Sequence, residues 1–256
     1  MSNAFKISIF TFGLFTLFIF QSWAQISEEI EQSFVVHSRS DFSLDNINGK
    51  VKINSWQKSA IKVKAKIIAE TQASRDKITI QIKQLGQKVS VYTDHKDKSY
   101  QLKNADVARV DYDVWLPAQT KLANITLVNG TLIIEKIAGD LVAEIVNGSF
   151  KANGLRGNSD ISSVNASVKV VYDDIPSELD DIALKTVNGS IKLALPENIN
   201  ADVHADTMYG SIKTAFALQT KNNRLFGNTL VDASGQGGAK VNLTSITGDI
   251  ELLKSK

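Results

Sequence analysis

The sequence has no cysteine, only three prolines and three histidines, and few aromatic residues. The absence of cysteine excludes disulfides, thiolate metal sites and lipid attachment to an N-terminal cysteine. The histidines, His37, His95 and His204, lie far apart and share no metal-ligand spacing. The formal net charge is +2 and no basic block is longer than two residues, which is not the composition of a nucleic-acid binder. Core packing and backbone hydrogen bonds must therefore stabilise the chain, and we expect no metal and no cofactor.

Residues 1–24 have the pattern of a secretory signal peptide. Lys6 precedes an apolar run over residues 7–20, and the small residues Ser22 and Ala24 follow it. We expect cleavage between Ala24 and Gln25, and hence export. An uncleaved anchor is the alternative, although the run is shorter than the roughly 20 residues of a membrane span. No transmembrane segment is expected after cleavage.

A glycine-centred motif recurs after the middle of the chain. Residues 127–171 divide into the nine-residue frames LVNGTLIIE, KIAGDLVAE, IVNGSFKAN, GLRGNSDIS and SVNASVKVV. Frames with Val-Asn-Gly or Val-Asn-Ala alternate with frames that have Ile-Ala-Gly or Leu-Arg-Gly at the same place, so the period is about 18 residues. The motif returns at 186–193, 207–214 and 245–252, and an early copy, NINGKVKI, stands at 46–53. We expect about 18–23 residues per coil, and two coils between Gly210 and Gly248.

Alternation of apolar and polar residues, as at 110–116 and 191–195, predicts strands, and no long window outside the signal has helical spacing. The predicted fold is an all-β, single-stranded β-solenoid. A chain of hairpins would not need a nine-residue repeat, whereas a solenoid does. A sandwich of hairpins is the alternative. We expect residues 107–256 to form the solenoid and residues 25–106 to form an N-terminal β region that caps or starts it. A separate small domain is the alternative for 25–106.

In a stack of coils, like side chains lie above one another, so we expect an asparagine ladder at one corner, followed by glycines with positive φ. Ala166 interrupts the glycine series, and its replacement by glycine should stabilise the coil if φ is positive there. The asparagines also fit the Asn-x-Ser/Thr acceptor pattern, which we interpret as a by-product, because an interior ladder would be inaccessible. The predicted turn residues are Asn129, Gly130, Gly139, Asn147, Gly148, Gly157, Asn165, Asn188, Gly189, Gly210 and Gly248.

Several blocks in this order resemble a bacterial family. They are NINGKVKINSW followed by IKVKAKI, then YDVWLPAQTKLANITLVNGTL and the recurring VNGSIKL units. Together they are similar to the putative-adhesin family, an exported β-strand-repeat domain of unknown function, over about residues 34–253. The resemblance implies a right-handed solenoid, an envelope or surface setting, and adhesion or stress sensing. It supplies no catalytic residues.

Few polar side chains are candidates for catalysis or metal binding. Asp173, Asp174, Asp180 and Asp181 flank Pro176, and we expect them in a solvated loop, because aspartate favours turns. Calcium binding and catalysis by this loop are the alternatives, and no catalytic residue is predicted. His204, between Asp202 and Asp206, is expected on an exposed strand face, with a metal site as the alternative.

Lys62, Lys64 and Lys66 alternate with apolar residues and should share a solvated face that discourages edge pairing. A stripe that binds a polyanion is the alternative interpretation.

The pattern favours an exported, non-enzymatic protein of the periplasm, outer membrane or cell surface that is not a lipoprotein. It would present a repetitive face to an envelope or surface protein or glycan, and no nucleic-acid partner is expected. The alternatives are an envelope-stress module that acts through a protein or peptide, and a glycan-cleaving β-helix enzyme.

Overall fold

The computed structural model describes residues 25–96, 108–223 and 227–255, so the predicted signal peptide lies outside the described residues. The all-β prediction is confirmed, because the described residues form 17 strands and one short helix, α1 (Gln72–Asp76). No helix in these ranges is both long and apolar enough to span a membrane. The strands are β1 (Ile26–Val35), β2 (Asp41–Trp56), β3 (Ala60–Ala69), β4 (Ile78–Leu85), β5 (Lys88–His95), β6 (Arg109–Pro117), β7 (Lys121–Glu135), β8 (Leu141–Leu155), β9 (Ser159–Tyr172), β10 (Asp181–Asn188), β11 (Ile191–Leu195), β12 (Ala201–Tyr209), β13 (Ile212–Thr214), β14 (Thr220–Asn223), β15 (Gly227–Ser234), β16 (Ala239–Thr247) and β17 (Ile250–Lys254).

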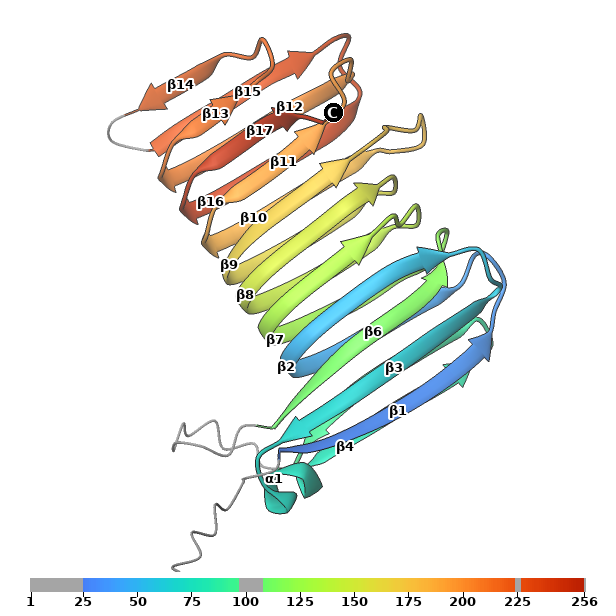
Figure 1. Cartoon of the computed structure of the whole chain (residues 1–256). Helices are drawn as coiled ribbons and strands as arrows, with labels where there is room; N and C mark the ends of the chain where they lie inside the picture. Colours follow the sequence, from blue (N-terminus) through green and yellow to red (C-terminus); the bar gives the residue numbers. More distant parts are fainter. Residues whose placement is uncertain (1–24, 97–107, 224–226, 256) are drawn as a thin grey trace, which may run out of the picture.

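The strands stack into two layers that meet at a corner (Figure 1). The long strands β2, β7, β8 and β9 bend near their middle, so that each contributes a first arm to one layer and a second arm to the other. We call the layer of first arms layer A, which continues through β10, β16 and β12. The layer of second arms is layer B, which continues through β11, β17 and β13.

Parallel pairing in the middle of the stack keeps like residues in register. Asn129 of β7 pairs with Asn147 of β8, which pairs with Asn165 of β9, at steps of 18 residues. The early copy of the motif joins the same stack, because Gly49 of β2 pairs with Gly130. The period found in the sequence is therefore the length of one level of the stack.

The order of the levels departs from the order of the chain at both ends. Near the N-terminus, β2 lies between β6 and β7 in layer B, although β6 follows it in the sequence. Near the C-terminus, β16 and β17 lie between the level of β10 and β11 and the level of β12 and β13. The step from Gly189 to Gly210 fits the expected 18–23 residues per coil, but these two glycines do not lie on adjacent levels, because Gly248 lies between them.

The two coils expected between Gly210 and Gly248 are also not present. This segment extends layer A with the antiparallel strands β15 and β14, and the chain then returns in β16. At the other end, β1, β3 and β4 pair antiparallel with their neighbours. The sheet is therefore open and mixed, whereas the sequence predicted one uninterrupted parallel coil.

The core lies between the two layers. The largest fully buried side chains include Phe42 from layer A and Tyr112, Phe150 and Tyr172 from layer B. Alternate residues of each arm point inward, which is the pattern that the strand period predicts. Burying one such apolar side chain contributes about 1.5–3 kcal/mol, so the stack is stabilised level by level.

The glycines at the corner allow successive backbones to approach closely. A Cβ on Gly148 would lie 1.8 Å from the carbonyl oxygen of Gly130, and one on Gly189 would lie 2.2 Å from that of Ala166. φ is positive at Gly130, Gly148 and Gly248 but not at Gly189 or Gly210, so the positive φ expected at every corner glycine is only partly correct. Close approach is the shared requirement. It also applies to the turn glycines Gly139 and Gly157, where a Cβ would lie 2.3 Å and 2.5 Å from the nearest carbonyl oxygens.

We expect Gly148→Ala to lower the free energy of unfolding by about 3 kcal/mol or more, because the new Cβ would overlap the carbonyl of Gly130 at a φ of +132°. Urea unfolding measures the change. Gly86→Ala is the control, since Gly86 has a φ of +60° but no heavy atom within 4 Å of the added Cβ. It should cost only about 1–2 kcal/mol. Equal losses in the two variants would contradict close packing at the corner.

Ala166→Gly should destabilise the protein by about 0.5–1 kcal/mol, instead of stabilising it as the glycine series suggested. Ala166 is 2% exposed, and its φ is not positive. Glycine would therefore lose buried apolar surface and gain entropy in the unfolded chain. Urea unfolding of this variant beside the wild type tests the sign, and a gain in stability would mean that the level of β9 is strained.

Asp249, in the turn before β17, is hydrogen-bonded to Ser211, in the turn before β13. Its Oδ1 accepts hydrogen bonds from the backbone N–H and the hydroxyl of Ser211, both at 2.8 Å, and these bonds hold the pKa of the carboxyl below its usual range. A lowered folded-state pKa contributes stability above the unfolded pKa that is lost as the pH falls through the folded pKa. We expect Asp249→Asn to reduce stability at pH 7 and to weaken the acid dependence below about pH 4. Urea unfolding of the variant and the wild type at pH 7 and below about pH 4 measures both changes, and an unchanged acid dependence would contradict the prediction.

Candidate functional site: the corner ladder and the outer faces

The asparagine side chains form a hydrogen-bonded ladder along the corner. The amide Nδ2 of Asn147 donates to Oδ1 of Asn129 at 2.8 Å, and Asn165 donates to Asn147 at 2.9 Å. Asn188 extends the ladder at one end, and Asn129 donates to Asn48 at the other. Asn48 was missed as a member, although the motif NINGKVKI contains it and was the signal for it.

The ladder lies on the outside of the corner and not in the interior. Asn129, Asn165 and Asn188 are exposed, because the backbone bends so that their amides point away from the core. The inaccessibility assumed for the Asn-x-Ser/Thr sequences is therefore wrong. Inside the same corner, buried hydroxyls bind backbone carbonyls, as where Ser163 donates to Ala166 at 3.0 Å and Thr207 to Gly248 at 2.8 Å.

An apolar stripe runs beside the asparagine ladder on the outside of layer A. It consists of residues one position before the ladder on successive strands, and exposure increases toward the level of β12. Val164 is 37% exposed, Ile246 is 43% exposed and Met208 is 56% exposed. The full stripe is Ile47, Val128, Val146, Val164, Val187, Ile246 and Met208.

The three lysines of β3 form ion pairs with two carboxylates of β1. Lys62 contacts Glu31 at 2.7 Å and Lys64 contacts Glu29 at 3.0 Å, and the same carboxylate lies 3.9 Å from Lys66. β3 is not an edge strand, because it pairs with β1 on one side and β6 on the other. These contacts leave little free positive charge for the polyanion-binding interpretation of this stripe.

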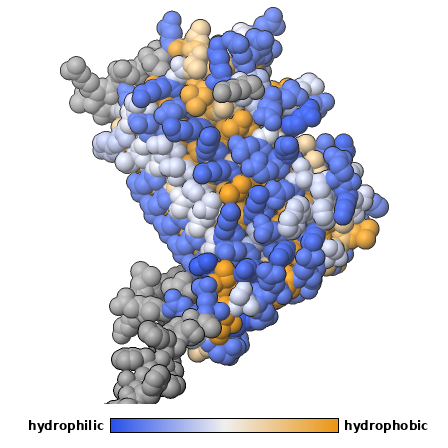
Figure 2. Space-filling view, viewed as in Figure 1, coloured by the Kyte–Doolittle hydropathy of each residue, from blue (hydrophilic) through white to orange (hydrophobic). Residues whose placement is uncertain are grey.

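The outer face of layer B has a basic character elsewhere. Reading across adjacent strands, one column of outward positions contains Lys151 of β8, Lys169 of β9 and Lys192 of β11. The face turned toward the viewer in Figure 2 is mostly hydrophilic, and its hydrophobic side chains occur in small separate groups.

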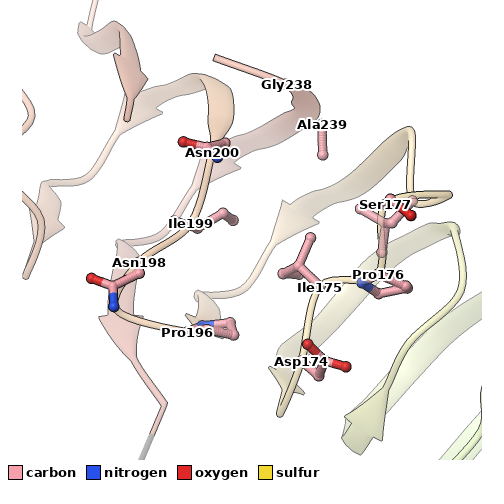
Figure 3. Close-up of a pocket in the computed structure, with 11 residues that line it drawn as sticks. Asp174, Ile175, Pro176, Ser177, Pro196, Asn198, Ile199, Asn200, Gly238 and Ala239 are labelled. Atoms are coloured by element: carbon pink, nitrogen blue, oxygen red, sulfur yellow. The ribbon is translucent and has the colours of Figure 1, made fainter. Parts of the chain in front are cut away.

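Asp174 is the acidic residue that lines a cleft in the described part of the chain (Figure 3). The cleft has a volume of about 300 Å³ and lies among the turns after β9, β11 and β15, with Pro176, Pro196 and Asn200 in its walls. The carboxylate of Asp174 is held by Arg156 at 2.8 Å. Asp181 accepts from Asn242 at 3.2 Å in β16 and is not in the cleft wall. The two carboxylates that glycoside hydrolysis requires therefore do not converge here.

The histidines do not form a metal centre within the described ranges. His204 Nε2 contacts a carboxylate oxygen of Asp206, and no group of three potential ligands gathers there or elsewhere in those ranges. Burial lowers the pKa of His95, and the neighbouring Asp94 partly opposes the change.

Two buried tyrosines have a raised pKa because burial disfavours the phenolate. Burial raises the pKa of Tyr112 to about 12, and its hydroxyl lies 2.7 Å from Thr93 Oγ1. The pKa of Tyr172 is also raised, and its hydroxyl donates to Ser159 Oγ at 2.9 Å. Both groups are parts of the core with satisfied hydroxyls, and neither lines the cleft beside Asp174. Tyr112 lines another cleft of about 300 Å³, together with charged residues such as Lys64 and Asp113.

No family model matches the sequence, and no curated protein does. The structure is similar to that of a putative cell adhesion protein from Clostridium sporogenes, with a TM-score of 0.55 and 12% identity over 89% of this chain and 100% of that chain. A putative adhesin from Bacteroides fragilis aligns over 88% of this chain and 97% of its own, at 12% identity and a TM-score of 0.30. The resemblance to adhesin-like proteins noted from the sequence is thus confirmed at the level of the fold.

Proposed function

We propose that this chain is an exported, non-enzymatic protein of the cell envelope or surface. In this proposal the stacked levels form a β-solenoid scaffold, interrupted at both ends, that presents a repetitive face to a protein or glycan. The observation that carries the proposal is the in-register stack from β2 to β12, which aligns like side chains in columns on its outer faces. Extended repeat folds bind through such surfaces.

The geometry of the polar groups supports a binding role over a catalytic one. In the described residues, the carboxylate in the cleft wall, Asp174, is already bound by Arg156, and the buried tyrosines have satisfied hydroxyls. General acid–base chemistry on a sugar needs two carboxyl groups on opposite sides of the scissile bond. The fold likeness to the clostridial protein, described as a putative cell adhesion protein, supports the same role.

A second candidate is an envelope-stress module that acts through a protein or peptide partner. The open edges of β1 and β4 favour it, because in the described ranges β1 pairs with β3 alone and β4 pairs with β5 alone. An extended peptide can add to such an edge by backbone hydrogen bonds.

Fractionation of cells that express the tagged full-length chain, with and without surface proteolysis, tests the location. We expect the protein in the envelope or surface fraction, and the exported protein purified from it should bind cells or envelope polymers. A deletion strain should lose part of its adhesion to surfaces or to other cells. Retention in the cytoplasm, or absence of both binding and an adhesion phenotype, would contradict the proposal. Retained adhesion with loss of a stress response would favour the second candidate.

A further inference from the structure

The outer face of layer B carries a column of lysines that the strand register places side by side. Lys151 pairs with Lys169, and Lys169 pairs with Lys192, on three adjacent parallel strands. We call these three residues the lysine column. Neighbouring strands are about 4.8 Å apart, so the three ammonium groups start from backbone positions at that spacing. All three side chains are exposed.

The charges in this column are only partly compensated. Lys192 contacts Glu251 of β17 at 3.0 Å, whereas Lys151 and Lys169 form no ion pair with any described residue. Like charges directly opposite one another destabilise a sheet. On layer A, by contrast, charges of opposite sign are neighbours, because the register places Lys240 between Asp181 and Asp202. The lysine column is therefore an unfavourable arrangement that the same chain avoids on its other face.

A column of hydroxyls borders the lysine column. Ser149 and Ser167 stand two residues before Lys151 and Lys169, and Thr131 of β7 continues this row of hydroxyls and accepts a hydrogen bond from Ser149 at 3.3 Å. Hydroxyl groups both donate and accept hydrogen bonds, so this border can bind the hydroxyls of a sugar. The lysines supply donors for anionic groups along the same line.

We propose that the lysine column and its hydroxyl border bind a linear polysaccharide that carries carboxylates. The proposal rests on the proposed function as a binding scaffold and names the class of its ligand. The lysines form a line across three adjacent strands, which favours an extended ligand over a compact one, and a sugar unit is similar in length to the spacing between strands. Charge complementarity requires an acidic polymer, and the hydroxyl border favours a glycan over a nucleic acid or a lipid surface.

The tryptophans supply a spectroscopic signal on the same face. Trp56 and Trp115 stack with their ring centroids 6.5 Å apart, and Lys62 lies 5.5 Å from the ring centroid of Trp115. Both belong to layer B, in the neighbouring strands β2 and β6. The third tryptophan, Trp23, precedes the predicted cleavage site. Tryptophan fluorescence of the cleaved protein therefore reports on this face alone.

The test measures binding of the exported, purified protein to polygalacturonate, with fully methyl-esterified polygalacturonate as the uncharged probe. We expect the wild type to bind the acidic polymer, to bind the ester at least about tenfold more weakly, and to lose affinity as salt increases. Lys151→Glu/Lys169→Glu should weaken binding by about tenfold or more. Lys121→Glu/Lys185→Glu changes the net charge equally on layer A, and it should change the affinity by less than about twofold because those charges face away.

Thermal unfolding separates loss of the site from loss of the fold. Lys169→Glu places a carboxylate between Lys151 and Lys192, so this variant should melt at a higher temperature than the wild type while it binds the polymer more weakly. If the lysine column binds the polymer, the melting temperature rises while the affinity falls. If the substitution causes misfolding, the melting temperature falls instead. Quenching or a shift of tryptophan fluorescence should accompany binding of long polymers to the wild type.

The proposal is overturned if the wild type does not bind polygalacturonate, if it binds the ester equally well, or if the layer A variant loses as much affinity as the layer B variant. Tighter binding to anionic lipid vesicles or to DNA would also overturn it. If Lys151→Glu/Lys169→Glu still binds cells as well as the wild type, the ligand class is wrong and the proposed function stands. If the wild type binds neither the polymer nor cells, both fail.

Discussion

Close approach of the backbone at the corner is the constraint on which the rest of this structure depends. Neighbouring strands of a parallel stack are about 4.8 Å apart, and at each bend that has a glycine, the backbone passes within contact distance of a carbonyl of the adjacent level. At Gly130 and Gly148 no Cβ can be accommodated without moving that carbonyl. Glycine at this point allows the two arms to fold together, so that residues such as Phe42 and Phe150 can share one core.

The same constraint explains the side chains next to the glycines. Once the corners are superimposed, the preceding asparagines are one strand spacing apart, and their amides can bond along the stack from Asn48 to Asn188. Hydroxyls such as Ser163 and Thr207 bind the carbonyls on the inner side of the bend. The hydroxyls thus satisfy buried backbone groups on the inner side, as such groups require, whereas the asparagine amides on the outer side bond to one another.

Stacking in register also turns a short sequence motif into a surface. A residue that is repeated at one place in the motif becomes a column that crosses several strands, so its chemistry is multiplied along one line. The apolar stripe beside the asparagine ladder and the lysine column on layer B both arise in this way. The cleft near Asp174 arises differently, from turns of unequal length, and its walls contain no convergent pair of acids in the described residues. The candidate binding surfaces are consequently the faces of the stack.

Sequence reasoning found the units of this fold more easily than their arrangement. The alternating apolar residues indicated strands, and the spacing of Asn129, Asn147 and Asn165 matched the register that the structure has. The exposure of these asparagines was assigned wrongly, because the motif does not reveal the direction of the bend. The neutralisation of Lys62 and Lys64 was also not predictable, since their partners Glu31 and Glu29 lie on a different strand whose pairing is non-local.

The sequence by itself determined the repeating unit, its strands, its glycine turns and its register with a neighbour, because these depend on residues within one or two motifs. Only the tertiary structure decided the order of the levels. β2 lies between strands that follow it in the chain, and β16 and β17 lie between levels that precede them. The physical reason is that every level offers the same backbone edge and a similar corner. The pairing energies of neighbouring strands are therefore similar for several possible orders of the levels. The path of the connecting chain and the packing of both ends of the stack select one order.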